Sequence, residues 1–274
     1  MSTSRDDSSL ALFCDFENVA LGVRDANYAK FDIALVLERL LLKGNIVTKK
    51  AYCDWERYKE FKPVMHDAAF ELIEIPHTRQ SGKNSADIRM VVDALDLCYT
   101  KEHIDTFVII SGDSDFSPLV SKLRENDKLV IGVGVKNSTS DLLMSNCDEF
   151  IFYDELAQEH KKSQQRKRKP AAKKPTAKSG RGKRPAKEEE GHLDEGIALV
   201  VETAEAIDAD QGGRQKLWGS MVKQALKRRR PGFNERQYGV RSFGDLLEEA
   251  ENRGLLKLEL DERSGGYVIT SLTP

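Results

Sequence analysis

The stretch FVIISGDSDFSPLV, residues 107 to 120, runs from apolar residues into two aspartates that stand one residue apart. A continuous apolar run of this kind is typical of a strand buried on both faces of a parallel sheet. Asp113 and Asp115 follow where that strand would end, and no Lys or Arg stands near them in sequence. Two crowded carboxylates repel each other unless a positive group lies between them, and a divalent metal ion is one such group.

Short β-rich runs and amphipathic runs alternate on both sides of this stretch. Strands are expected at 10–16, 46–55, 70–76, 105–111 and 128–135, with a last strand or strand–helix edge at 149–156. Helices are expected at 31–44, 57–69, 85–103, 116–127 and 139–147. This alternation, with mostly apolar strands, predicts an α/β domain over residues 8–156 whose parallel sheet is covered by helices on both faces.

The remaining residues predict a linker and a second domain. Residues 157–191 have no apolar period and read as a disordered basic linker. Within them, residues 161–187 hold thirteen Lys or Arg and no acid, which leaves 30 basic against 45 acidic residues elsewhere. Such a segment could be a solubilising tether, but thirteen positive charges without an acid favour binding of a polyanion such as RNA. Residues 192–274 predict three helices and a β-hairpin, the order of a winged helix, with Ser242 and Asp245 in a capping box.

Composition excludes several classes of protein. The 274 residues suggest two domains. No run is long and apolar enough for a membrane helix, and the polar start MSTSRDDSSL lacks the apolar core of a signal peptide. We therefore expect a cytoplasmic protein with no membrane partner. The four cysteines and five histidines lack the spacing of a zinc site or a disulfide framework.

Acidic residues converge on one edge of the expected sheet. Asp15 closes the first strand, Asp113 and Asp115 follow the fourth, and ligands of such sheets bind beyond the carboxyl ends of the strands. Asp87 shares the apolar face of its helix, where an uncompensated charge is costly, whereas Asp93 is expected to point to solvent. Taken alone, Asp87 could simply be an acidic residue in the first turn of its helix, where the helix dipole favours a negative charge. Together, the four converging carboxylates favour a metal site.

Carboxylate oxygens suit Mg²⁺ or Mn²⁺, which would stabilise charge on a phosphate undergoing displacement. Arg79, Lys83 and Asn84 precede Asp87, and Lys136 follows the fifth strand. These residues could hold a phosphate backbone, or they could belong to ordinary polar loops. No Walker A, G-x-G-x-x-G or G-x-S-x-G motif offers another reaction class.

These motifs resemble the NYN branch of the PIN-domain superfamily, the bacterial LabA-like group. The resemblance rests on DFENV, GKNSADIRMVVDAL, SGDSDFSPLV and SNCDEFIFYDEL, and it covers residues 8 to 156. It implies a sheet of order 3-2-1-4-5 and a metal-dependent nuclease that acts on RNA. The acids that it implies as catalytic and metal-binding are Asp15, Asp87, Asp113 and Asp115, with Asn18 and Ser111 as supporting polar groups.

Residues 193 to 272 resemble the OST-HTH/LOTUS winged-helix module, on the stretch RSFGDLLEEAENRGLL. The helix expected to enter a DNA groove, 242–253, is acidic, which disfavours reading of duplex DNA. Positive charge lies on the preceding helix instead, where Lys223, Arg228 and Arg229 are candidate RNA contacts. A protein partner of this domain and a homodimer are left open.

Two functions fit these patterns. The first is a Mg²⁺- or Mn²⁺-dependent ribonuclease whose linker and winged helix help to bind RNA. The second is a non-catalytic RNA-binding or regulatory adaptor that retains the acidic crevice.

Overall fold

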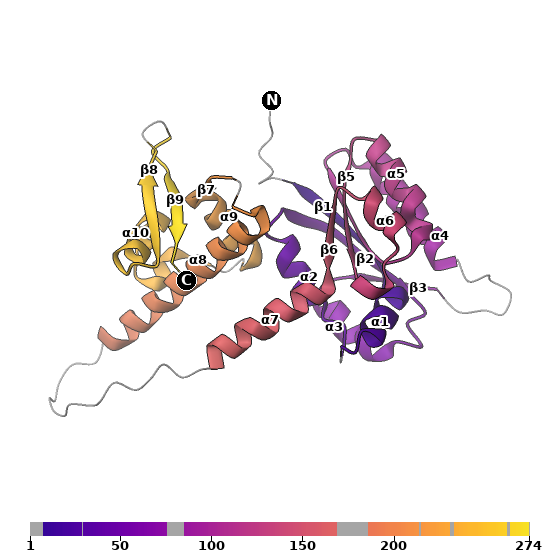
Figure 1. Cartoon of the computed structure of the whole chain (residues 1–274), viewed down its shortest axis with the longest axis horizontal. Coiled ribbons are helices and arrows are strands. Elements are labelled where there is room, and N and C mark those ends of the chain that lie inside the picture. The colour runs from indigo at the N-terminus through magenta and orange to yellow at the C-terminus, as the bar shows by residue number, and fades with distance from the viewer. Residues whose placement is uncertain are drawn as a thin grey trace. The chain divides into compact units, whose positions relative to one another are not determined.

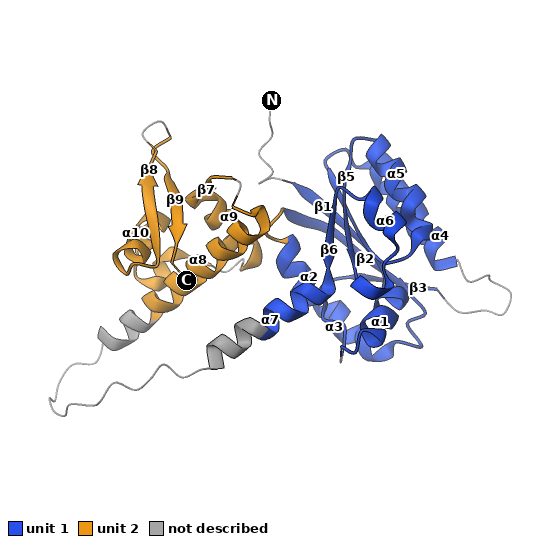
Figure 2. Cartoon of the chain, in the orientation of Figure 1, with its two compact units in different colours: residues 1–40, 44–171 blue, residues 41–43, 172–274 orange. Residues whose placement is uncertain are grey.

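The computed structural model describes residues 8–28, 30–75, 85–168, 186–213, 215–230, 233–261 and 264–273. The chain divides into two compact units (Figure 2). The first comprises residues 1–40 and 44–171, and the second comprises residues 41–43 and 172–274.

The first unit is built on a six-stranded parallel sheet in the order β3-β2-β1-β4-β5-β6 (Figure 1). Its strands are β1 (Ser9–Asp15), β2 (Asn45–Cys53), β3 (Glu71–Glu74), β4 (Thr106–Ile110), β5 (Leu129–Gly134) and β6 (Glu149–Phe152). The strand order reverses between β1 and β4, so a switch point lies beyond the ends of these two strands. The expected order 3-2-1-4-5 is confirmed, and β6 extends it by one strand.

Helices cover both faces of this sheet (Figure 1). One face packs against α1 (Phe16–Asp25), α2 (Ile33–Leu40), α3 (Lys62–Asp67) and α7 (Tyr153–Arg168), and the other against α4 (Ser85–Thr100), α5 (Ser117–Glu125) and α6 (Asp141–Asn146). Short 3-10 turns are η2 (Lys59–Phe61), η3 (Ser114–Phe116) and η4 (Lys136–Ser138). In β1, Leu10, Leu12 and Cys14 face the first core, and Ala11 and Phe13 face the second. This central strand is therefore buried on both sides, as its apolar sequence predicts.

Helix α1 was not expected from the sequence. It follows β1 without a loop because Asp15 both ends the strand and caps the helix, its Oδ1 accepting the N–H of Asn18 at 3.4 Å. Val19 and Val23 bury its inner face. The polar residues of DFEN conceal this apolar periodicity when the sequence is considered alone.

The expectation that Asp93 points to solvent is wrong. Its side chain is 12% exposed and lies between α4 and β2. Tyr52 Oη donates to Asp93 Oδ2 at 2.9 Å, Lys50 Nζ lies 3.3 Å from the same oxygen, and Arg89 Nε donates to Oδ1 at 3.0 Å. Helical periodicity places Asp93 outside the apolar stripe of α4, but the long side chains of Tyr52 and Lys50 extend from β2 and contact it.

The segment expected to be a disordered linker is helical at both ends. Helix α7 continues to Arg168, and α8 (Ala186–Gln211) already begins at Ala186. Leu156 and Ala157 are buried in the core of the first unit, which anchors the start of α7. The residues between the two helices, 169–185, lie outside the described ones.

In its described residues, the second unit combines three helices with a three-stranded antiparallel sheet in the order β7-β9-β8. Its elements are α8, β7 (Leu217–Trp218), α9 (Gly219–Arg229), η5 (Glu235–Tyr238), α10 (Phe243–Asn252), β8 (Leu256–Leu260) and β9 (Tyr267–Leu272). Helix α10 begins at the predicted capping box. The Ser242 side chain accepts the N–H of Asp245, and the Asp245 side chain accepts the N–H of Ser242.

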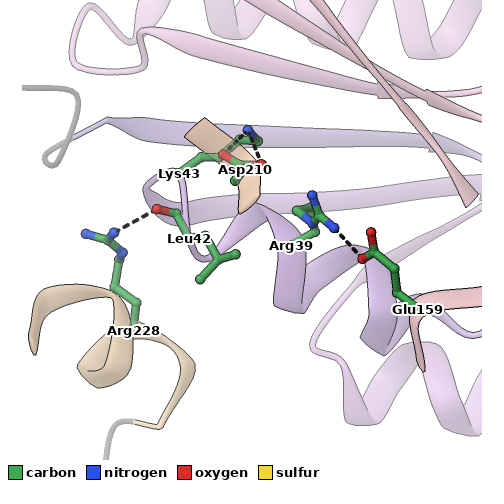
Figure 3. Close-up of polar contacts among 6 residues, drawn as sticks. All are labelled: Arg39, Leu42, Lys43, Glu159, Asp210 and Arg228. Atoms are coloured by element: carbon green, nitrogen blue, oxygen red, sulfur yellow. Dashed lines mark hydrogen bonds and ion pairs between the residues drawn. The ribbon is translucent and has the colours of Figure 1, made fainter. Parts of the chain in front are cut away.

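Polar contacts join sequence-distant segments inside each unit (Figure 3). In the first unit, Arg39 pairs with Glu159 at 2.6 Å. In the second, Lys43 pairs with Asp210 at 2.7 Å, and one guanidinium nitrogen of Arg228 donates to the Leu42 carbonyl at 3.1 Å.

Among the described residues, no helix is both long and apolar enough to cross a membrane.

Candidate active site

A buried carboxylate stands at the switch point of the sheet. Asp15 is the last residue of β1 and is only 7% exposed. Ser111, which follows β4 and is fully buried, donates its hydroxyl to Asp15 Oδ2 at 3.0 Å. β1 and β4 are neighbouring parallel strands, so their carboxyl ends bring these two side chains together. Asp15 and Ser111 therefore meet at the carboxyl ends of β1 and β4.

A chain of hydrogen bonds continues from Ser111 to the acidic loop. Ser111 Oγ accepts the N–H of Asp113 at 3.2 Å, and Asp113 Oδ1 accepts the N–H of Asp115 at 3.0 Å. Across the switch point, the N–H of Gly112 donates to Asn18 Oδ1 at 2.9 Å. The start of α1 and the loop after β4 are thus joined to each other by side-chain hydrogen bonds.

The four predicted acids influence one another electrostatically. Burial raises the pKa of Asp15 to about 7, the Asp87 carboxylate adds to this rise, and hydrogen bonds from Ser111 and Asn18 oppose it. Burial, followed by the carboxylates of Asp113 and Asp115, raises the pKa of Asp87. Asp87, in the first turn of α4, therefore shares the crevice with the residues at the strand ends.

These carboxylates do not form a closed metal cage. Within the described part of the chain, no three His, Cys, Asp or Glu side chains stand close enough together to hold a metal ion. Asp15 is buried, whereas Asp115 is exposed, so the acids differ in their access to solvent.

The loop after β5 packs against the loop after β4. A Cβ on Gly112 would lie 2.4 Å from the Ser138 carbonyl oxygen, so only glycine allows this approach. The N–H of Ser140 donates to the Gly112 carbonyl at 2.9 Å. Lys136, one of the predicted RNA contacts, belongs to this second loop. Its N–H donates to Asp154 at 2.7 Å, and its Nζ lies 5.9 Å from the centre of the Phe152 ring.

The other predicted RNA contacts either lie outside the described residues or already have partners within the protein. Arg79, Lys83 and Asn84 lie outside the described residues. In the second unit, Lys223 pairs with Glu235 at 2.7 Å, and Arg228 donates to the carbonyls of Leu41 and Leu42. Arg229 is 16% exposed and contacts Thr203 and Glu202. These three cations therefore hold the second unit together, in addition to any contact with a polyanion.

An open pocket adjoins the acids, and sequence analysis did not anticipate it. Its volume is about 630 Å³, and it lies among α4, η3, α5 and α6. The lining residues are Asp87, Ile88, Val91, Ser114, Asp115, Ser117, Pro118, Ser121 and Leu142. No spacing in the sequence joins position 88 to positions 117 and 142, so only the tertiary packing shows this pocket.

The fold and the site together define an α/β protein with a carboxylate-lined crevice at the switch point of a parallel sheet. The model of the NYN domain matches residues 9–154, and the chain belongs to this family, whose members are generally nucleases that act on RNA. The α/β fold and the sheet order are consistent with that assignment.

Two similar proteins extend the comparison. An uncharacterized protein of Methanocaldococcus jannaschii is 30% identical over 138 residues, which are 50% of this chain and 54% of that protein. The chain therefore matches about half the length of this relative. A crystal structure of a Vibrio parahaemolyticus protein of unknown function has 25% identity and a TM-score of 0.50, and the match covers 56% of this chain and 98% of that one.

Proposed function

We propose that the chain is a ribonuclease that hydrolyses RNA phosphodiester bonds at the crevice of Asp15, Asp87, Asp113 and Asp115, with the help of Mg²⁺ or Mn²⁺. The observation that carries the proposal is the buried Asp15 at the switch point, whose pKa is raised to about 7 by burial and neighbouring acids. Strongly perturbed carboxylates in a crevice are typical of functional sites.

The donor set fits a hard divalent cation. Every candidate ligand is a carboxylate oxygen, the type that Mg²⁺ and Mn²⁺ prefer, and mutual repulsion among the acids favours a positive ion between them. Asp15, Asp87 and Asp113 are the residues that would hold it, with Asp115 at the exposed rim. A bound ion would supply the positive charge that a phosphate needs in an acidic crevice.

The other residues of the site orient these acids. Ser111 donates to Asp15 and accepts from the Asp113 N–H, so it fixes both ends of the cluster and favours ionised Asp15. Asn18 holds the N–H of Gly112 and thereby the start of the acidic loop. Substrate RNA reaches the exposed Asp115, and Lys136 lies in the loop that packs against Gly112.

The alternative is a non-catalytic RNA-binding adaptor that retains the crevice. It is favoured by one observation, the lack of a closed metal-ligand group among the described side chains. Cleavage of RNA distinguishes the two functions, because an adaptor would bind RNA and leave it intact.

The decisive experiment measures cleavage of end-labelled single-stranded RNA by the purified full chain. We expect cleavage with Mn²⁺ or Mg²⁺, none with EDTA, and a loss of at least about a hundredfold for Asp113→Asn with RNA binding retained. Asp141→Asn is the control, since it removes the same charge at an exposed position of α6. RNA binding without cleavage by the wild type, across several RNAs and both metals, would establish the adaptor instead.

We also propose that the second unit is a winged-helix module of the OST-HTH/LOTUS kind. Its element order of helix, strand, two helices and a β-hairpin supports this assignment. The acids of α10 are engaged internally: Glu249 pairs with Arg253 at 3.1 Å, and Glu251 accepts the N–H of Leu258 at 2.8 Å. This helix is negatively charged and its acids already have partners, so RNA binding by the basic residues of the chain is favoured over reading of duplex DNA by α10.

A further inference from the structure

The loop after β2 packs against the residue that follows Asp15. Trp55 is 1% exposed, and its ring centre lies 5.0 Å from that of Phe16, the first residue of α1. Tyr58 also contacts Phe16, with ring centres 5.8 Å apart. The Trp55 N–H donates to Glu74 of β3 at 2.9 Å. Because β2 pairs with β1 in parallel, this loop lies at the carboxyl edge of the sheet, beside Asp15.

Arg57 extends from this loop to the start of α1. Its Nη1 lies 3.3 Å from Glu17 Oε1, and the two side chains are 53% and 32% exposed. Glu17 stands in the first turn of α1, two residues after Asp15. Burial and the two acids after β4 raise the pKa of Asp87, and Glu17 adds to this rise. Glu17 therefore borders the acidic crevice, and its ion pair places the positive charge of Arg57 there.

Arg57 and Tyr58 both keep hydrogen-bond donors for a ligand. In the described part of the chain, Glu17 is the one partner of the Arg57 guanidinium, whereas a guanidinium has five N–H donors. Tyr58 is half-buried, and no described residue forms a hydrogen bond with its hydroxyl. Burial and the Glu17 carboxylate raise the pKa of this hydroxyl, whereas Arg57 lowers it, so the hydroxyl lies near both charges. An exposed cation beside a second donor suits an anionic oxygen ligand.

Two further acids of the loop already have cationic partners. Glu56 pairs with Lys62 at 3.1 Å, and Glu60 pairs with Lys30 at 3.4 Å. These acids therefore offset little of the Arg57 charge.

We propose that Arg57 and Tyr58 bind a backbone phosphate of RNA next to the phosphate that is cleaved at the acids. The guanidinium fork matches the oxygens of a phosphate, and the hydroxyl adds a further donor. An exposed ion pair contributes little to stability, so Arg57 can turn from Glu17 toward the phosphate or bridge the two. Contacts of this kind fix the register of a nucleic acid and do not read its sequence. The inference rests on the proposed function, because it takes the acidic crevice as the place where RNA is cut.

Variants of the full chain that also carry Asp113→Asn test this site, because such chains should bind RNA in Mg²⁺ without cutting it. Arg57→Gln should raise the Kd for single-stranded RNA at least about fivefold at about 0.1 M salt, and Tyr58→Phe should raise it about two- to fivefold. Glu17→Gln should leave the Kd unchanged or lower it, since it removes an acid and leaves Arg57 to the phosphate. Fluorescence anisotropy measures the Kd, and all three variants should unfold at the same temperature as the parent chain.

The matched control is Arg124→Gln, because Arg124 forms a similarly exposed ion pair with Asp148, at 3.0 Å and with side chains 46% and 28% exposed. Asp148 precedes β6 at the amino edge of the sheet, so this variant should bind RNA within about twofold of the parent chain.

Equal Kd values for Arg57→Gln and Arg124→Gln would overturn the phosphate site and leave the ribonuclease intact. Equal weakening by Glu17→Gln and Arg57→Gln would also overturn the site, because the ion pair would then act through the structure of the loop. If the wild type cuts no RNA but Arg57→Gln, unlike the control, binds RNA more weakly, the ribonuclease falls and the phosphate site stands.

Discussion

At the scale of single residues, the burial of Asp15 has a cost in stability. The site buries its carboxylate beside other acids, and its pKa rises from 3.8 to about 7 as a result. A carboxyl group whose pKa is raised on folding stabilises the native state below its unfolded pKa, and this contribution is lost as the pH rises through the folded pKa. Ionised Asp15 therefore destabilises the folded protein at alkaline pH unless a cation compensates.

We predict that Asp15→Asn is more stable than the wild type at pH 8 in EDTA, by up to about 4 kcal/mol from the size of the shift. The difference should shrink toward pH 4, where the native carboxyl is protonated. Urea unfolding at several pH values measures it. Adding Mn²⁺ should raise the stability of the wild type and not that of the variant. If the difference in unfolding free energy between Asp15→Asn and the wild type did not change with pH, the burial of the Asp15 carboxylate would not be costly, and the prediction would be wrong.

At the scale of elements, polar side chains join α4 to β2. Asp93, six residues further along α4, is tied to Tyr52 and Lys50 of β2. Burial acts to raise the pKa of Asp93, but hydrogen bonds from Tyr52, Lys50 and Arg89 outweigh it and lower the pKa. A lowered pKa means that this group stabilises the fold above about pH 4 and ceases to do so as the pH falls further.

We predict that Asp93→Asn lowers the free energy of unfolding at pH 7 by about 1–2 kcal/mol, because bonds to a charged, half-buried partner are lost. The loss should become smaller at about pH 3, and it should be seen by denaturant unfolding with circular dichroism. Asp96→Asn, at an exposed position of the same helix, is the control and should change stability by less than about 0.5 kcal/mol. Equal losses in the two variants would refute the role given to the β2 contacts.

At the scale of the whole molecule, charge is divided unevenly along the chain. Thirteen Lys or Arg stand in residues 161–187, and the rest of the chain has an excess of acids. A polyanion is attracted to this basic segment by counterion release, and that attraction weakens steeply with salt.

We predict that changing these thirteen residues to Gln in the full chain weakens RNA binding by at least about tenfold at 0.1 M salt and flattens the dependence of log Kd on log salt. Cleavage of saturating short RNA should change little, because the acids that we assign to catalysis lie before residue 116. Fluorescence anisotropy across a salt series measures the effect. An unchanged slope would show that the segment does not contact RNA.

The sequence by itself determined the alternation of strands and helices, because apolar runs and amphipathic periods follow from burial on a parallel sheet. It also determined that Asp15 would close β1, that Asp113 and Asp115 would follow β4, and that Ser242 would cap α10. These features could be predicted because each depends on residues that are close together in the sequence. Helix α1 was missed because the polar cap at Asp15 masks a short apolar face.

Only the tertiary structure decided which side chains meet. The Ser111 bond to Asp15, the Asn18 bond to Gly112 and the Tyr52 bond to Asp93 all join residues more than forty positions apart. The pocket around Ser117 likewise depends on how α4, α5 and α6 pack on one face of the sheet. Burial, pKa and unsatisfied hydrogen bonds arise from these non-local neighbours, and no local pattern carries information about them.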